Sequence, residues 1–161
     1  MMIRNEKPPD LAAIRKVVEA AFRRPLEAEL VDRLRADCYS VISLVGVERG
    51  QIVGHVLFSK MTAPFKALGL APVSVMPSRQ GSGIGSRLIR AGLKRAADGG
   101  WNGVFVLGDP EYYKRFGFSP ARARGFTSPY AGSNLMVLAL NGDLPVTKGK
   151  IDYAPPFAAL G

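Results

Sequence analysis

Residues 70–98 constrain the fold of this chain more than any other stretch. An apolar run over 70–76 leads into a turn with glycine at every second position, and beyond it apolar residues recur at helical spacing as far as Asp98. The three turn glycines are Gly81, Gly83 and Gly85. This pattern predicts a strand, a tight turn and an amphipathic helix whose first backbone amides have no acceptor inside the helix.

Such a turn favours a bound anion. Glycine removes the Cβ atoms that would keep a phosphate from the main chain, and the free amides and the positive end of the helix dipole converge on one point. Two familiar phosphate motifs do not fit. The dinucleotide pattern G-x-G-x-x-G would end on Ser86 or Leu88, and a P-loop would need a lysine after Gly85, where Ser86 stands.

A third motif does fit. Gln80-x-x-Gly83-x-Gly85 follows a strand that ends Val-x-Val-x-Pro, and here the sequence resembles the GNAT superfamily of N-acetyltransferases. Further on, the stretch from Tyr113 to Gly117-Phe118 resembles the superfamily's Y-x-x-x-G-F ending. The runs Val-Gly-His-Val at 53–56 and Gly-Asp-Pro-Glu-Tyr-Tyr-Lys-Arg-Phe-Gly-Phe at 108–118 look like a bacterial branch of acetyltransferases, a resemblance that covers almost the whole chain.

The resemblance implies an α/β fold of the acyl-CoA N-acyltransferase (GNAT) type, in which a central mixed sheet with a splayed pair of parallel strands is flanked by helices. In that fold the turn holds the pyrophosphate of acetyl-CoA (coenzyme A), and the preceding strand lies beside the pantetheine arm. An amide at or near Val75 would polarise the thioester carbonyl. Because Pro72 has no N–H group, we expect a missing or bulged strand pairing there. The residues assigned to the co-substrate are Val73, Ser74, Val75, Gln80, Gly81, Ser82, Gly83, Ile84, Gly85 and Ser86.

The resemblance also implies direct attack by a primary amine, on a small molecule or a protein, in a ternary complex. Tyr113 is the expected acid for the leaving thiolate, since a phenol matches a thiol better than a carboxylic acid does. The alternative reading of Tyr113 is an aromatic side chain packed beneath Phe116 and Phe118. Tyr112 stays a second candidate, because Val106 stands where many members carry Asn and the helix that follows is shorter.

The group that takes a proton from the amine is left open by the sequence. Water, Glu111 and the only histidine, His55, are the candidates. The alternative reading of His55 is a strand histidine that is hydrogen-bonded across the sheet. The identity of the acceptor amine is also open, because no fixed motif selects it.

Length and residue usage limit the other classes. With 161 residues, of which 47% are apolar, the chain can build one core, so we expect a single domain over 1–161. No apolar run approaches the roughly 20 residues of a membrane span. The early residues are polar and resemble no signal sequence, so a cytoplasmic protein is expected. Cys38 is the single cysteine, and together with one histidine it predicts no metal site.

The formal charge of +9 raises the question of a nucleic-acid partner. The basic residues are spread along the chain without interleaved aromatics, which favours a solvated basic surface that partly serves a polyphosphate. Two rival classes remain: a CoA-binding regulatory or degenerate member without turnover, and a nucleic-acid-associated protein whose binding falls steeply with salt. A homodimer is common among proteins of this resemblance, and the oligomeric state is left open.

Hydrophobic patterning predicts the remaining elements. They are a strand at 2–6, helices at 10–22 and 26–35, a hairpin at 40–47 and 51–59, a strand at 103–107, a short helix from Pro110 and a strand at 134–140. Asp10 and Asp109 are the predicted helix N-caps. Residues 148–153 are expected to add a short edge strand, and 121–132 to form an irregular segment.

Overall fold

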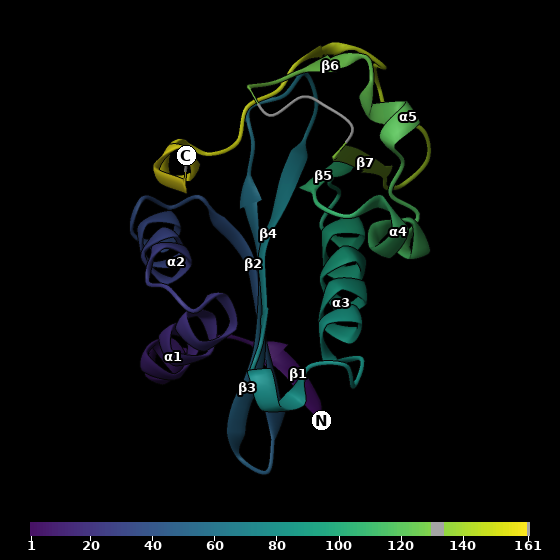
Figure 1. Cartoon of the computed structure of the whole chain (residues 1–161). Helices are drawn as coiled ribbons and strands as arrows, with labels where there is room; N and C mark the ends of the chain where they lie inside the picture. The colour runs from purple at the N-terminus through teal and green to yellow at the C-terminus, as the bar shows by residue number, and fades with distance from the viewer. Residues whose placement is uncertain (130–133, 161) are drawn as a thin grey trace.

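The computed structural model describes residues 1–129 and 134–160. Within them, six strands form a mixed sheet in the order β1-β2-β3-β4-β5-β7. Helices cover both faces of this sheet (Figure 1). The strands of this sheet are β1 (Met2–Asn5), β2 (Ser40–Glu48), β3 (Gln51–Lys60), β4 (Ala67–Val75), β5 (Gly103–Leu107) and β7 (Leu135–Ala139). The helices are α1 (Leu11–Phe22), α2 (Leu26–Ala36), α3 (Ile84–Asp98), α4 (Pro110–Tyr113) and α5 (Pro120–Ala123). The predicted fold class is confirmed, and so are the predicted strands and helices of the sheet layers.

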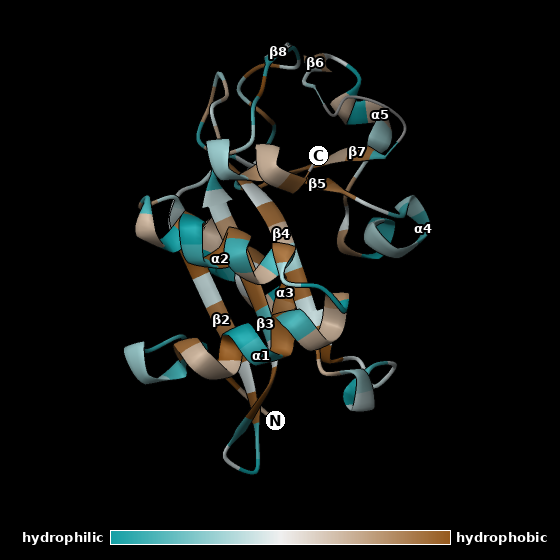
Figure 2. Ribbon diagram, turned by 60° about the vertical axis from the view of Figure 1, so that its left-hand side comes forward, coloured by the Kyte–Doolittle hydropathy of each residue, from teal (hydrophilic) through white to brown (hydrophobic). Residues whose placement is uncertain are grey.

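The sheet separates two layers of apolar packing. Helices α1 and α2 cover one face and α3 covers the other, while the central strands carry most of the strongly apolar residues (Figures 1 and 2). Because neighbouring strand residues point to opposite faces, Val45 and Leu57 belong to the α1/α2 layer, whereas Leu44 and Val56 belong to the α3 layer. The sheet is therefore buried on both sides, and open backbone is confined to its edges and gaps.

Helix α3 buries the side that its periodicity predicts. Ile84, Leu88, Ile89 and Ala96 are buried, and Gly92 lies among them on the same face. At Gly92 the ring of the fully buried Phe58 on β3 approaches the helix backbone. This close approach sets the distance between α3 and the sheet, and with it the position of the first turn of the helix.

Strands β4 and β5 run side by side only briefly. Their parallel pairing is limited to Ala67–Gly69 opposite Gly103–Phe105, after which no strand among the described residues pairs with β4 on that side. On its other side β4 stays paired with β3, but Leu70 and Val73 oppose Phe58 and Val56, so three steps along β4 match two along β3. The bulge falls at Ala71-Pro72. Both the splayed pair and the irregularity at Pro72 are confirmed.

Three local predictions differ from the structure in part. Asp10 is the N-cap residue of α1 as predicted, but its side chain makes no capping bond there, because its carboxylate accepts from the Lys7 amide at 2.7 Å and pairs with Arg4. The short strand predicted within 148–153 forms as β8 (Gly149–Lys150), but it pairs with β6 (Phe126–Thr127) in a separate two-stranded sheet and not with the main sheet. The segment 121–132 was expected to be irregular, yet it contains β6 and most of α5. The rest of that prediction, at 130–132, lies outside the described residues.

None of the helices in the described part of the chain is both long enough and apolar enough to cross a membrane.

Candidate active site

The glycine turn connects the end of β4 to α3 and leaves its amides exposed. Gly81 and Gly83 have φ of +81° and +86°, and a Cβ added at either would meet nothing within 4 Å. Gly83 is the N-cap of α3 and no side chain caps the helix. The first helical bond runs from the Arg87 amide to the Gly83 carbonyl at 3.1 Å. Among the described residues, therefore, no group accepts from the amides of 84–86, and the space over the turn is open.

The polar side chains of the turn point back to the protein. The Gln80 Nε2 donates to the Val75 carbonyl at 3.1 Å, and the Ser82 hydroxyl donates to the Arg79 carbonyl. Arg79 in turn donates twice to the Glu48 carboxylate, at 2.8 Å each, which lowers the pKa of Glu48 through the hydrogen bond. The side chains of Gln80 and Ser82 thus shape the turn, and its main chain is what faces outward.

The strand before the turn presents amides to its open edge. The Met76 amide donates to the Val53 carbonyl of β3 at 2.8 Å. Because strand amides alternate in direction, the Val75 amide points away from β3, toward the side that β5 has left. Val73 shares this orientation, and the side chains of both valines face Gly85 of α3. Ser74 differs, since its side chain is 1% exposed.

Helix α4 brings Tyr112 to this place. Its hydroxyl lies 3.1 Å from the Ser86 hydroxyl in the first turn of α3, and a Cβ on Gly85 would lie 3.6 Å from it. The Arg115 guanidinium stacks 4.5 Å from the centre of the Tyr112 ring. The structure thus gathers a phenol, a serine hydroxyl and a cation beside the uncapped amides. No sequence pattern pointed to Arg115, because its role depends on the turn of α4.

Tyr113 lies deeper, at the end of β5. Its ring covers Gly108 and makes an edge contact with the ring of Phe118 at 5.9 Å between centroids. The packed reading of Tyr113 is therefore confirmed. Burial, with a smaller effect of Tyr112, raises the pKa of Tyr113 to about 12. The hydroxyl consequently keeps its proton at physiological pH. Its role as an acid stays a prediction, and the packing of the ring does not exclude it.

The predicted cap of α4 is also in place. The Asp109 carboxylate accepts from the Glu111 amide at 3.0 Å. The Glu111 side chain itself is largely exposed and pairs with Lys114 at 2.7 Å. Glu111 is therefore turned to solvent.

His55 is fully buried in β3, and its reading as a histidine hydrogen-bonded across the sheet is confirmed. Its Nε2 lies 2.8 Å from the Ser43 hydroxyl on β2. Ser43 also contacts the Glu6 carboxylate, which Arg35 of α2 holds at 2.8 and 3.0 Å. Burial lowers the pKa of His55, against the opposing effect of Glu6. Sequence reasoning missed Glu6, Arg35 and Ser43, because they follow β1, lie on α2 and lie on β2 respectively and share no motif.

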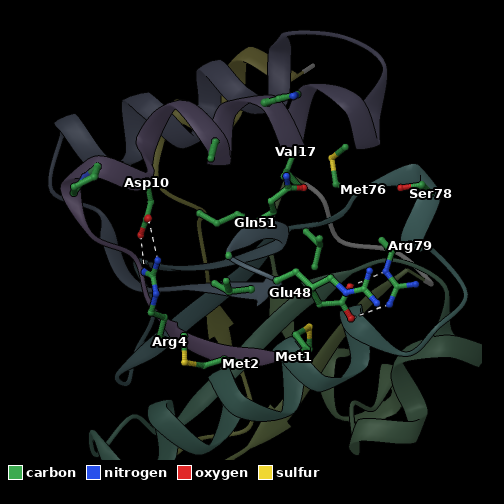
Figure 3. A pocket seen from close by; sticks show the side chains of 18 residues that line it. Met1, Met2, Arg4, Asp10, Val17, Glu48, Gln51, Met76, Ser78 and Arg79 are labelled. Carbon is green, nitrogen blue, oxygen red and sulfur yellow. Dashed lines mark hydrogen bonds and ion pairs between the residues drawn. The ribbon is translucent and has the colours of Figure 1, made fainter.

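A groove lies on the α1 side of the turn. Its volume is about 1150 Å³, and it runs between α1, the β2–β3 hairpin and the segment 76–79 (Figure 3). The ion pairs Arg4–Asp10 and Glu48–Arg79 stand at its two ends (Figure 3). The residues that line it include Ser78 but none of the predicted co-substrate or catalytic residues. The groove and the open amides are thus separate features that meet at the turn.

Comparison with known proteins agrees with this geometry. The sequence model of the Acetyltransferase (GNAT) family matches residues 11–118. The Escherichia coli K12 protein named Uncharacterized N-acetyltransferase YjhQ is 40% identical over 130 residues, which are 75% of this chain and 71% of that protein.

Two solved structures are similar over nearly the full length. The crystal structure of a GNAT family acetyltransferase from Brucella melitensis in complex with acetyl-CoA has a TM-score of 0.83 and 41% identity, covering 97% of each chain. The Escherichia coli GNAT family N-acetyltransferase YhbS in complex with CoA has a TM-score of 0.88 and 31% identity, covering 99% of this chain and 93% of that one. With its turn, its parted strands and these relatives, the chain belongs to the acetyltransferase (GNAT) family.

Proposed function

We propose that this N-acetyltransferase moves the acetyl group of acetyl-CoA to a primary amine by direct attack in a ternary complex. One observation carries the proposal: the amides of 84–86 have no acceptor among the described residues, and they stand under open space at the end of a strand that has parted from its neighbour. Amides at a helix N-terminus bind phosphate groups well. Two similar structures are described as complexes with acetyl-CoA and CoA.

In this proposal the main chain of residues 81–86 binds the pyrophosphate. The uncapped amides supply the hydrogen bonds. The side chains of Gln80 and Ser82 stabilise the turn by donating to the carbonyls of Val75 and Arg79. Ser86, linked to the Tyr112 hydroxyl, closes one side of the site, and Arg115 over the Tyr112 ring adds positive charge. The glycines allow the phosphates to approach the backbone.

Val73, Ser74 and Val75 form the edge along which the pantetheine lies. Val73 and Val75 contribute amides directed to the gap, whereas the polar main-chain groups of Ser74 face β3 and its side chain is buried, so Ser74 only holds the two valines in place. The Val75 amide is the donor that we assign to the thioester carbonyl. A fixed donor at that oxygen stabilises the charge that develops as the amine attacks.

Tyr113 is the acid in this proposal. Its ring lies at the end of β5, on the far side of the gap from β4, whereas the Tyr112 hydroxyl is engaged with Ser86 in the pyrophosphate turn. A phenol with a pKa of about 12 is a weaker acid than a thiol near pKa 8.5. Its proton can therefore pass to sulfur only while the C–S bond is breaking, and the Tyr113 phenolate regains a proton from the water that has taken one from the attacking amine. His55 is buried away from the site, and the Glu111 side chain faces solvent and pairs with Lys114. We therefore propose water as the base that takes a proton from the amine.

Two measurements test the function. Calorimetry with coenzyme A at up to millimolar concentration should show binding, and a panel of amines should produce amine-dependent release of free thiol from acetyl-CoA. Absence of any heat with coenzyme A would overturn the proposal. Binding without turnover for every amine would favour the rival reading, a CoA-binding regulatory or degenerate member.

The proposal extends to the whole chain. The family match ends at residue 118, but Tyr153 and Phe157 belong to the same buried cluster as Ile14 and Val31. This shared core supports a single domain over 1–161. A cytoplasmic location, supported by the use of acetyl-CoA, and a homodimer remain predictions, which fractionation and sedimentation check.

A further inference from the structure

A buried chain of hydrogen bonds fixes the protonation of Glu6. Arg35 donates from Nε to Oε2 at 2.8 Å and from Nη2 to Oε1 at 3.0 Å. Burial alone would raise the pKa of Glu6, but the nearby His55 ring and the hydrogen bonds from Arg35 and Ser43 hold that pKa far below its usual range. An ionised carboxylate can only accept hydrogen bonds. The Ser43 hydroxyl, which contacts Oε1, must therefore donate to Glu6.

The proton of Ser43 then fixes the tautomer of His55. With its hydrogen committed to Glu6, the Ser43 oxygen can only accept from His55 Nε2, which lies 2.8 Å away. The imidazole of His55 consequently carries its proton on Nε2. Its Nδ1 is left with a bare lone pair, which needs a donor. The charged groups that act on the ring are Glu6 and Arg35.

Nδ1 has no donor in the described residues, and a second orphan lies opposite. His55 is 0% exposed and Ser74 is 1% exposed, and both Nδ1 and the Ser74 hydroxyl are buried without a hydrogen-bond partner. The two residues face each other across β3 and β4. Cβ atoms of facing residues lie about 4.5–5.5 Å apart, so the two unpartnered atoms belong to neighbouring side chains, and a buried water commonly satisfies such groups. The lone pair and the hydroxyl are complementary partners for such a water.

We propose that one buried water joins His55 Nδ1 to the Ser74 hydroxyl, and that His55 is thereby a positioning residue for the strand segment 73–75. The second half rests on the proposed function, since this segment is the edge assigned to acetyl-CoA. The bulge at Ala71-Pro72 interrupts the ladder just before the segment. The bridge from His55 to Ser74 adds a link between β3 and β4 next to the missing ladder bonds. This link fixes the direction of the Val75 amide.

The first test is independent of acetyl transfer. Because the chain has a single histidine, long-range ¹H–¹⁵N spectra of tag-free protein report His55 alone. We expect the neutral Nε2–H form, with an Nδ1 shift typical of a hydrogen-bonded acceptor, to persist well below pH 6.5. An Nδ1–H tautomer, or titration near the ordinary pKa of 6.5, would overturn the proposal.

A pair of serine variants provides the second test. Ser59 is the matched control for Ser74, because it is also buried and unpartnered, on the same face of the sheet, but faces Gly69 at the start of β4. Ser74→Ala should lower kcat about fivefold and raise the KM for acetyl-CoA, because the Val75 amide that it helps to hold serves the charge that develops as the amine attacks. Ser59→Ala should leave kcat and the KM unchanged.

The outcomes separate the two levels of the proposal. If the Ser74 hydroxyl is a true orphan, Ser74→Ala removes a buried unpaired group, so it stabilises the fold and leaves kcat, the KM and the Nδ1 shift unchanged. That result overturns the bridge. If the wild-type protein binds no coenzyme A, the proposed function fails, while the tautomer and the change of the Nδ1 shift in Ser74→Ala still decide whether the water exists.

Discussion

The ring of Phe58 lies against the Cα of Gly92, so closely that a methyl group at position 92 would overlap its ring carbons. Phe58 is fully buried, so its ring has no room to retreat. Replacing a helical glycine by alanine gains up to about 1 kcal/mol of helix propensity. Overpacking a core costs about 1–3 kcal/mol. The cost of overpacking exceeds the gain in helix propensity. The distance between α3 and the sheet therefore depends on the absence of a side chain at Gly92.

We therefore expect Gly92→Ala to lower the free energy of unfolding by about 1–2 kcal/mol. Urea unfolding followed by circular dichroism measures it. Gly85→Ala is the control in the same helix, because its Cβ would make only ordinary contacts of 3.6 Å, and it should be neutral or stabilising. A more stable Gly92→Ala variant would show that the ring yields.

Gly83→Ala tests the anion site. At φ +86° an alanine is strained, so the turn would relax to another conformation and move the exposed amides out of position. We expect the Kd for coenzyme A to rise at least tenfold, an effect of about 1.4 kcal/mol. Calorimetry measures the change.

Gly142→Ala is the matched control, since Gly142 has φ +103° with open space around it and lies in the turn after β7. It should lose similar stability and keep its affinity for coenzyme A. Equal loss of affinity in both variants would mean that the effect comes from instability alone.

The two tyrosines should separate kinetically. Tyr113→Phe removes the proposed acid, so kcat should fall by about 100-fold or more, the range of general acid catalysis, with little change in the KM for acetyl-CoA. Tyr112→Phe removes a hydrogen bond to Ser86, so the KM should rise severalfold with kcat retained. Steady-state kinetics near neutral pH distinguish them. The reverse pattern would move the acid to Tyr112.

Acid should weaken the fold through His55 first. Its folded-state pKa lies below 6.5, so the unfolded chain binds a proton more readily and stability falls as the pH drops below about 6.5. The depressed pKa of Glu6 acts in the same direction, below about pH 4.5. Between pH 6.5 and 5 we expect a slope of up to about 1.4 kcal/mol per pH unit from the single histidine.

Urea unfolding at several pH values measures this slope. The variant His55→Gln should be less stable at pH 7 and should lack the slope between pH 6.5 and 5. A wild-type protein whose stability is independent of pH over that interval would contradict the buried neutral histidine.

The fold was predictable from the sequence where a local pattern carries the physics. The glycine turn, the irregularity at Pro72 and the cap at Asp109 each depend on a residue type at fixed positions within a few residues, and each appears as predicted. Asp10 stands at the predicted N-cap position, but its side chain makes no capping bond because a partner six residues away, Arg4, competes for its carboxylate. Local rules do not contain such competition.

The site was predictable only in part, for the same reason. The turn can be read from consecutive residues, whereas the chain from Glu6 through Ser43 to His55 depends on three separate strand regions and on Arg35 of α2. Which tyrosine reaches Ser86 depends on how α4 turns after β5, and adjacent tyrosines look alike in the sequence. Tertiary geometry therefore decides these assignments.

The brief contact between β4 and β5 divides the sheet into two panels, which share only three facing residue pairs along their seam. A ligand that takes up hydrogen bonds along the vacated side of β4 would act as a surrogate strand and tie the panels together. Heat resistance of this protein should accordingly depend on its ligand, with a melting temperature that climbs as coenzyme A is added.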